Sequence, residues 1–109
     1  MVVEMKESNT FLAHDNYVLA LQFTADSRTL ISAGMDNVVK LWSAADWTHV
    51  RTLEGHQNSV NGLALSPDER MLATSSSDQT VRLWSFPDGA LLHTLQDTPS
   101  LTRPFLRIE

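Results

Sequence analysis

The hydrophobic residues of this chain fall in short runs that alternate with polar or small residues, with a period of two. This spacing is typical of β-strands, in which successive side chains point to opposite faces. Turn residues separate the runs, as at 24–27 and 86–89. Four strands joined by turns within about 40 residues predict an antiparallel meander, and the chain holds two of them. The eight expected strands are Val18–Phe23, Leu30–Ala33, Val38–Trp42, Trp47–Leu53, Val60–Leu65, Leu72–Ser75, Thr80–Trp84 and Leu91–Leu95.

The two meanders are copies of one unit. Residues 14–53 align without a gap on residues 56–95, and fifteen of the forty pairs are identical. Unrelated sequences would match at about one position in fifteen. The identical pairs include a histidine, an aspartate and a tryptophan, each separated from its copy by 42 residues. The chain is therefore predicted to contain a duplicated structural unit.

Several of the expected strands are apolar or small on both faces. In Val60–Leu65, for example, Val60, Gly62 and Ala64 alternate with Leu63 and Leu65. A sheet built from such strands has to be covered on both sides. Neighbouring repeats stacked face to face would provide that cover, whereas an isolated hairpin would not.

The residues that the copies share resemble the Gly-His…Trp-Asp signature of the WD-repeat β-propellers. The second unit carries it as Leu-Glu-Gly-His at 53–56, Asp78 and Leu-Trp-Ser at 83–85, and the first as Ala-His at 13–14, Asp36 and Leu-Trp-Ser at 41–43. The resemblance covers about Phe11 to Leu95. The sequence departs from the signature where Ser43 and Ser85 replace its aspartate and Ala13 replaces its glycine.

The resemblance implies an all-β fold of two four-stranded antiparallel propeller blades. The expected divisions are an N-terminal segment (1–10), blade 1 (11–53), blade 2 (54–95) and a C-terminal tail (96–109) with one possible extra strand. Propellers close with four to eight blades. The two blades are therefore expected to be part of a propeller that is completed by oligomerisation, or to be cut from a longer chain.

The resemblance also implies a hydrogen-bonded tetrad in each blade. Tryptophan supplies one donor, aspartate two acceptors, and histidine and a hydroxyl can do both, so a closed chain of four can satisfy every buried group. The expected structural tetrads are His14, Ser32, Asp36 and Trp42, and His56, Thr74, Asp78 and Trp84.

The same residue types invite a catalytic interpretation, because serine, histidine and aspartate are the members of a nucleophilic triad. Two observations favour the structural role. The set occurs twice, with Thr74 in place of Ser32, and neither residue lies in a Gly-x-Ser-x-Gly turn. Each tetrad also supplies only one histidine and one carboxylate, which is too few for zinc. No catalytic residue, metal or cofactor is expected.

Composition narrows the class of protein further. The 109 residues carry 13 acidic and 8 basic side chains, a net charge of −5, which is the wrong sign for binding nucleic acid. The absence of cysteine excludes disulfides and thiolate sites. No apolar stretch approaches the roughly 18 residues of a membrane span, and the N-terminus lacks the pattern of a signal peptide. We expect a cytoplasmic protein that binds neither nucleic acid nor membrane.

Positions where the two copies differ are candidates for partner binding. Tyr17 and Met35 correspond to Ser59 and Ser77, and in WD-repeat proteins these positions lie on the narrow face where partners commonly dock. Tyrosine and methionine are enriched at interfaces. Trp47, which has Gly89 as its counterpart, is expected to begin the fourth strand and is a further candidate contact.

The predicted function is a non-catalytic scaffold for protein–protein interaction, with protein partners and a homo-oligomer of two to four copies. One alternative is a regulatory or sensor module of a larger protein. The other is a hydrolase-like enzyme with a polar cluster at the channel mouth, for which no acid/base pair outside the tetrads was found. Fold does not determine function, so the sequence does not identify the partner protein.

Overall fold

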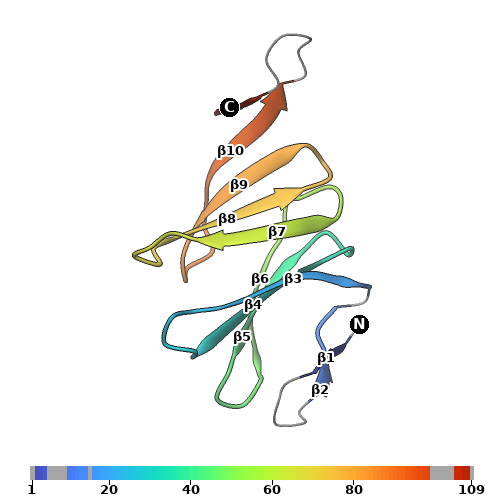
Figure 1. The fold of residues 1–109 in the computed structure, drawn as a ribbon, viewed down its shortest axis with the longest axis vertical. Coiled ribbons are helices and arrows are strands. Elements are labelled where there is room, and N and C mark those ends of the chain that lie inside the picture. Colours follow the sequence, from blue (N-terminus) through green and yellow to red (C-terminus); the bar gives the residue numbers. More distant parts are fainter. Residues whose placement is uncertain (1, 5–9, 15, 99–104, 109) are drawn as a thin grey trace.

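The computed structural model describes residues 2–4, 10–14, 16–98 and 105–108, and the side chains of 13–14 and 16–96. Within these ranges the chain forms eleven strands and no helix, so it has no helix long and apolar enough to cross a membrane. The strands make three antiparallel sheets (Figure 1). The smallest pairs β1 (Val2–Glu4) with β2 (Thr10–Leu12).

The first large sheet, called blade 1 here, is a meander in which every strand pairs with the next along the chain. Its order is β3 (Val18–Phe23), β4 (Thr29–Gly34), β5 (Val39–Ser43) and β6 (His49–Leu53). The alternation of the sequence sets the register, which places Leu30 opposite both Phe23 and Trp42. Short turns between the strands leave no room for another topology.

The second large sheet, blade 2, repeats this meander and adds one strand. Its order is β7 (Val60–Leu65), β8 (Met71–Ser76), β9 (Thr80–Ser85), β10 (Leu91–Thr98) and β11 (Phe105–Ile108). The first four of these strands correspond to those of blade 1, and β11 pairs antiparallel with β10. The prediction of an all-β fold with two four-stranded antiparallel blades is confirmed, with β11 as a fifth strand on the second.

The prediction that Trp47 begins the fourth strand is wrong. Trp47 lies in the turn before β6 with φ 60°, and its counterpart Gly89 has φ 79°. Its amide donates to the carbonyl of Ser43 at 2.7 Å, as the amide of Gly89 does to Ser85 at 2.8 Å. The turn needs a residue in the left-handed region, so the strand starts two residues later, at His49.

Aspartates organise the turns between the first two strands of each blade. Asp26 accepts from the Thr24 hydroxyl at 2.6 Å and the Arg28 amide at 2.9 Å, and Asp68 is held in the same way by Ser66 and Arg70. The hydroxyl hydrogen bonds lower the pKa of both carboxyls. These Asx-type turns fix where each chain reversal occurs.

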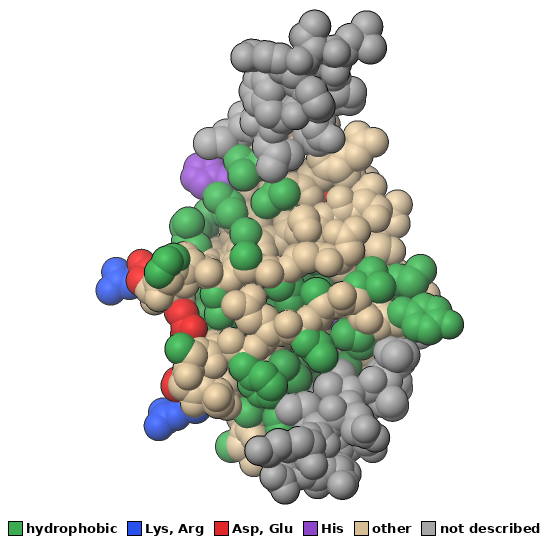
Figure 2. Space-filling model, viewed as in Figure 1, with side chains coloured by type: hydrophobic (Ala, Val, Ile, Leu, Met, Phe, Trp, Pro, Cys, Tyr) green, Lys and Arg blue, Asp and Glu red, His purple; other side chains and the backbone are tan. Residues whose placement is uncertain are grey.

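One hydrogen bond joins the two turns across the blades. The Ala25 amide of the β3–β4 turn donates to the carboxylate of Glu69, in the β7–β8 turn, at 2.7 Å. In Figure 1 both turns lie on the left of the molecule, and in Figure 2 the charged side chains gather on that side. On the face shown, the charged side chains therefore lie beside these two turns.

The main core lies between the blades. Ile31, Val39 and Leu41 of blade 1 pack with Leu72 and Trp84 of blade 2, and each is at most 3% exposed. Burying each such side chain contributes about 1.5–3 kcal/mol. A second, smaller cluster lies on the opposite face of blade 1 and consists of Ala13, Leu30 and Trp42, with Val18 and Trp47 packed against it.

Candidate functional site

The structure brings together the four residues expected to form a tetrad in blade 1. His14 Nε2 lies 2.7 Å from the Ser32 hydroxyl oxygen, which also accepts from Trp42 Nε1 at 2.9 Å. His14 Nδ1 lies 2.9 Å from each carboxylate oxygen of Asp36. The four side chains come from the loop before β3, from β4, from the β4–β5 turn and from β5, so the network ties all of these segments together.

The chemistry of the groups fixes the direction of the proton donation. Burial lowers the pKa of His14, although hydrogen bonding and the charge of Asp36 oppose this effect. Because an ionised carboxylate only accepts, Nδ1 of the neutral ring carries the proton and Nε2 accepts from Ser32. The hydrogen bonds therefore run from Trp42 to Ser32 to His14 to Asp36.

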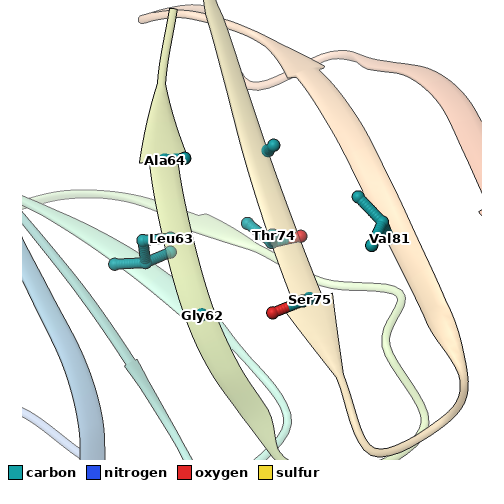
Figure 3. Close-up of a pocket in the computed structure, with 7 residues that line it drawn as sticks. Gly62, Leu63, Ala64, Thr74, Ser75 and Val81 are labelled. Atoms are coloured by element: carbon teal, nitrogen blue, oxygen red, sulfur yellow. The ribbon is translucent and has the colours of Figure 1, made fainter.

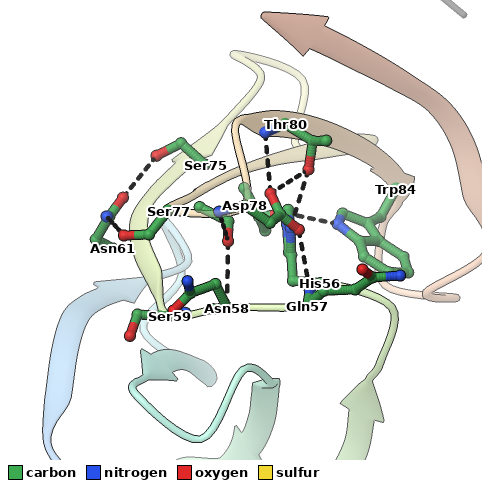
Figure 4. Close-up of polar contacts among 12 residues, drawn as sticks. His56, Gln57, Asn58, Ser59, Asn61, Ser75, Ser77, Asp78, Thr80 and Trp84 are labelled. Carbon is green, nitrogen blue, oxygen red and sulfur yellow. Dashed lines mark hydrogen bonds and ion pairs between the residues drawn. The ribbon is translucent and has the colours of Figure 1, made fainter.

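Blade 2 contains the same arrangement (Figure 4). Trp84 Nε1 donates to the Thr74 hydroxyl oxygen at 2.9 Å, and this oxygen lies 2.7 Å from His56 Nε2. His56 Nδ1 lies 2.9 Å from the carboxylate of Asp78. The distances match those of blade 1 to within 0.1 Å, so the replacement of serine by threonine leaves the network unchanged.

Asp78 has additional partners that inspection of the repeat did not find. It accepts from the Gln57 amide at 3.0 Å, from the Thr80 amide at 2.9 Å and from the Thr80 hydroxyl at 2.6 Å. Burial alone would raise the pKa of Asp78, but these bonds and the one from His56 outweigh it and hold the pKa well below its usual range. Thr80 was missed because its counterpart is Val38, although the Asp-x-Thr spacing is itself a signal for this turn.

The burial of the tetrads limits the chemistry that they can perform. Ser32 and Thr74 are each 0% exposed, so neither hydroxyl can reach a substrate while the blade is folded. Each of them also accepts a hydrogen bond from an indole. Among the described residues, no three His, Cys, Asp or Glu side chains are grouped as a metal site would require.

Tyr17 and Met35 lie side by side in blade 1, where Tyr17 directly precedes β3 and Met35 directly follows β4. The Met35 amide donates to the Tyr17 carbonyl at 2.9 Å, and the residues are 61% and 42% exposed. Gly34 is needed between them, because a Cβ at this position would lie 2.6 Å from the Tyr17 carbonyl oxygen. The backbone hydrogen bond thus holds two residues with large exposed side chains next to each other, beside the first two strands of blade 1.

The corresponding positions of blade 2 have the same backbone but a polar surface. The Ser77 amide donates to the Ser59 carbonyl at 2.9 Å, and the Ser77 hydroxyl accepts from the Asn61 side chain at 3.2 Å (Figure 4). Trp47 lies elsewhere, in its turn against the second core cluster, with its ring edge-on to Phe23 at 6.5 Å between centroids. The structure therefore groups four of the five expected partner-binding residues at one end of the molecule and separates Trp47 from them.

Comparison with known proteins agrees with this geometry. A family model described as the first β-propeller of WD repeat-containing protein 75 matches residues 9–102, which include both tetrads. A solved structure of U3-55K superimposes with a TM-score of 0.77 over 87% of this chain, at 24% identity. The match covers 32% of the U3-55K chain, so this sequence spans about a third of that protein's length. At this level of identity the likeness supports the fold.

Proposed function

The chain belongs to the WD-repeat β-propeller family that is represented by the first propeller of WD repeat-containing protein 75, and from this premise we propose that it is a non-catalytic scaffold for protein–protein interaction. The tetrads are assigned a structural role, since each buried hydroxyl is held between an indole and an imidazole of its own blade. Binding is assigned to exposed side chains that the blades hold in place.

The observation that carries this proposal is the exposed pair Tyr17 and Met35. Both side chains are large and more than two-fifths exposed, and the backbone hydrogen bond between the two residues, which Gly34 permits, keeps them adjacent. Tyrosine offers a large contact area with only two rotatable bonds, and tyrosine and methionine are both enriched at interfaces. We assign the partner contact to this pair, with a weaker contribution from Ser59 and Ser77.

The proposal is tested by measuring how single substitutions affect binding of a protein partner to the purified chain. Tyr17→Ala should weaken binding by more than about 1 kcal/mol, or about fivefold in Kd, without lowering stability. Val50→Ala, at a 54% exposed position on β6, is the matched control and should change neither quantity. A contact that maps entirely to β6 and β10 would overturn the assignment.

We also propose that the chain self-assembles. Each blade has one face in the shared core and a second face with exposed apolar side chains, and large apolar patches are uncommon on monomers. Two, three or four copies would supply four, six or eight blades, which is the range in which propellers close. Incorporation of the two blades into a longer propeller is the alternative that the same open faces allow.

A further inference from the structure

Strand β7 contains the one asparagine of the sequence that is followed by glycine, and the pairing of the strand is interrupted there. Asn61 is exposed and precedes Gly62. Val60 and Gly62 face consecutive residues of β8, so Asn61 between them has no partner in the register. Such a β-bulge leaves the extra residue outside the ladder and bends the strand. The Asn61–Gly62 peptide is therefore held less firmly than the rest of β7.

The Ser75 side chain of β8 contacts both residues of this pair. Its hydroxyl donates to Asn61 Oδ1 at 3.4 Å. It also points toward Gly62, its partner in the register, and a Cβ at Gly62 would collide with it (Figure 3). Asn61 Nδ2 donates in turn to the Ser77 hydroxyl at 3.2 Å (Figure 4). One hydroxyl thus lies against the glycine and within reach of the asparagine carbonyl oxygen.

An asparagine side chain can react with the backbone nitrogen of the residue that follows it. The nitrogen attacks Cγ, a negative charge develops on Oδ1, and ammonia leaves from Nδ2. The product is a cyclic imide, which water opens. Glycine favours the attack because it has no side chain to obstruct the approach and because it adopts conformations that are closed to other residues.

The surroundings of Asn61 favour each part of this reaction. The bulge removes the ladder partner that would hold Asn61 extended. Ser75 donates to the oxygen on which the charge develops, and donors in this position stabilise an oxyanion. Exposure of Asn61 admits the water that opens the ring.

The other asparagines with described side chains are placed less favourably. All of them precede residues that have a Cβ. The Tyr17 amide donates to Asn16 Oδ1 at 2.9 Å, and the Ser59 amide donates to Asn58 Oδ1 at 2.8 Å. Each of these hydrogen bonds has to break before the nitrogen can lose its proton and attack Cγ. Asn58 is therefore a natural control only three residues from Asn61.

We propose that Asn61 is a site of spontaneous deamidation in the folded protein, assisted by Ser75. The Gly62 nitrogen loses its proton to water and bonds to Cγ of Asn61, and the Cγ–Nδ2 bond breaks as ammonia leaves with a proton from water. A water molecule then opens the imide. Attack at Cγ gives aspartate, and attack at the backbone carbonyl gives isoaspartate. One water is consumed and one ammonia released, without oxidation or reduction.

Both products change the molecule. Each adds one negative charge to the net charge of −5, beside the Ser77 hydroxyl. Isoaspartate also inserts a methylene into the main chain of β7, the strand that meets β3 of blade 1. The pairing beyond the bulge and the packing of Leu63 in the core should then loosen. The site is independent of the proposed function and stands whether or not a partner binds nearby.

The test stores the purified, folded chain at neutral pH and follows it by ion exchange and peptide mass spectrometry. Trypsin releases residues 52–70 as one peptide, so fragment ions compare Asn58 and Asn61 in the same spectrum. Asn61 should convert at least about tenfold faster than Asn58, which corresponds to about 1.4 kcal/mol of activation free energy. Equal rates would overturn the proposal. So would an Asn61 amide that persists in the folded chain but converts in urea.

Two variants test the assigned roles without disturbing the fold. Blade 1 has alanine, Ala20 and Ala33, at the positions of Gly62 and Ser75, and pairs them in the same register. Ser75→Ala should slow conversion of Asn61 about threefold or more in the folded chain, as expected for the loss of one hydrogen bond, but not in urea. An unchanged rate in the folded variant would refute the assistance by Ser75.

The double variant Gly62→Ala/Ser75→Ala reproduces the alanine pair of blade 1 and avoids the collision that Gly62→Ala alone would cause. It should convert at least about tenfold more slowly than Ser75→Ala in both the folded and the urea-unfolded chain. Circular dichroism checks that both variants fold. Conversion of the folded double variant at the rate of Ser75→Ala would show that the Gly62 nitrogen is not the attacking group and would overturn the proposal.

Discussion

A single buried hydroxyl connects tryptophan to histidine in each blade, and this makes it the most sensitive atom of the tetrad. The Thr74 oxygen accepts from Trp84 and lies within hydrogen-bond distance of His56, and Ser32 occupies the same place in blade 1. Both hydroxyl residues are 0% exposed, and His56 and Trp84 are also buried. Loss of the hydroxyl would therefore leave two buried polar groups without a partner at once, and this costs more than an average hydrogen bond contributes.

Thr74→Val tests this with almost no change of shape. We expect it to lower the free energy of unfolding by about 1–3 kcal/mol, measured by urea denaturation, because it strands the indole N–H and an imidazole nitrogen. Thr52→Val is the matched control, since Thr52 bonds the exposed His49 and water can replace the lost hydroxyl. The control should lose less than about 0.5 kcal/mol. Equal losses in the two variants would contradict a special role for Thr74.

Stability should also depend on pH through two groups of the tetrads. The pKa of His14 is lowered by burial, so the unfolded chain binds its proton more readily than the folded one. Stability due to His14 is thus fully present above about pH 6.5, the ordinary histidine value, and is lost as the pH falls towards its folded pKa. Asp78 also has a lowered pKa, so its contribution is present above about pH 4 and is lost below it.

Denaturation midpoints measured between pH 8 and pH 3 should therefore fall in two stages. Asp78→Asn separates them, because the amide cannot titrate. In this variant the stage below about pH 4 should become smaller, while the stage that begins near pH 6.5 should remain. A midpoint that is constant from pH 8 to pH 5 would refute the assignment of the first stage to His14.

At the scale of the elements, the turns between the second and third strands differ in one instructive residue. Asn37 and Gln79 occupy the same position with φ 73° and 72°, in the left-handed region. Asparagine tolerates this conformation better than glutamine. Gln79→Asn should therefore raise the free energy of unfolding by up to about 1 kcal/mol, and Asn37→Gln should lower it by a similar amount. Thermal melts of both variants check the prediction, and changes of the same sign would contradict it.

The strands were predictable because the period-two hydrophobic pattern and the alignment of the two copies predict the same strand positions. All eight strands expected from the two copies are present, with ends that shift by at most three residues. Trp47 was misplaced because tryptophan favours strands, whereas the turn geometry decides its position. The bond from Ala25 to Glu69 was invisible in the sequence, since it joins two turns that become neighbours only when the blades stack.

The tetrads show the same division between what a repeat reveals and what it hides. Residues that recur in both copies, such as Trp42 and Trp84, could be found from the sequence and lie in the network as expected. Thr80 could not be found in this way, because its counterpart Val38 has no hydroxyl. A repeat search detects what the blades share, and features of one blade require local turn patterns or the structure.

At the scale of the whole molecule, two blades leave more surface open than a closed domain would. The radius of gyration is 14.4 Å, compared with about 13 Å for a compact domain of this length, and the longest extent is 49 Å. Two of the four blade faces are joined in the core. Leu21 and Phe23 are exposed on the face of blade 1 that points away from blade 2. A hollow lined by Ala73 and Val81 lies on the face of blade 2 that points away from blade 1 (Figure 3). These are the surfaces left without that cover.

This geometry predicts that stability depends on protein concentration. Association into two to four copies, covering the faces that point away from the shared core, stabilises each folded chain by about 0.7–1 kcal/mol for each tenfold increase in concentration above the dissociation constant, because the chain is its own ligand. For a chain of this size, the melting temperature should then rise by several degrees per tenfold increase. Calorimetry across a hundredfold range of concentration measures the rise, and light scattering on the same samples should give two to four times the 12.2 kDa chain mass. A constant melting temperature together with a monomer mass would show that two blades are stable without a partner for their outer faces.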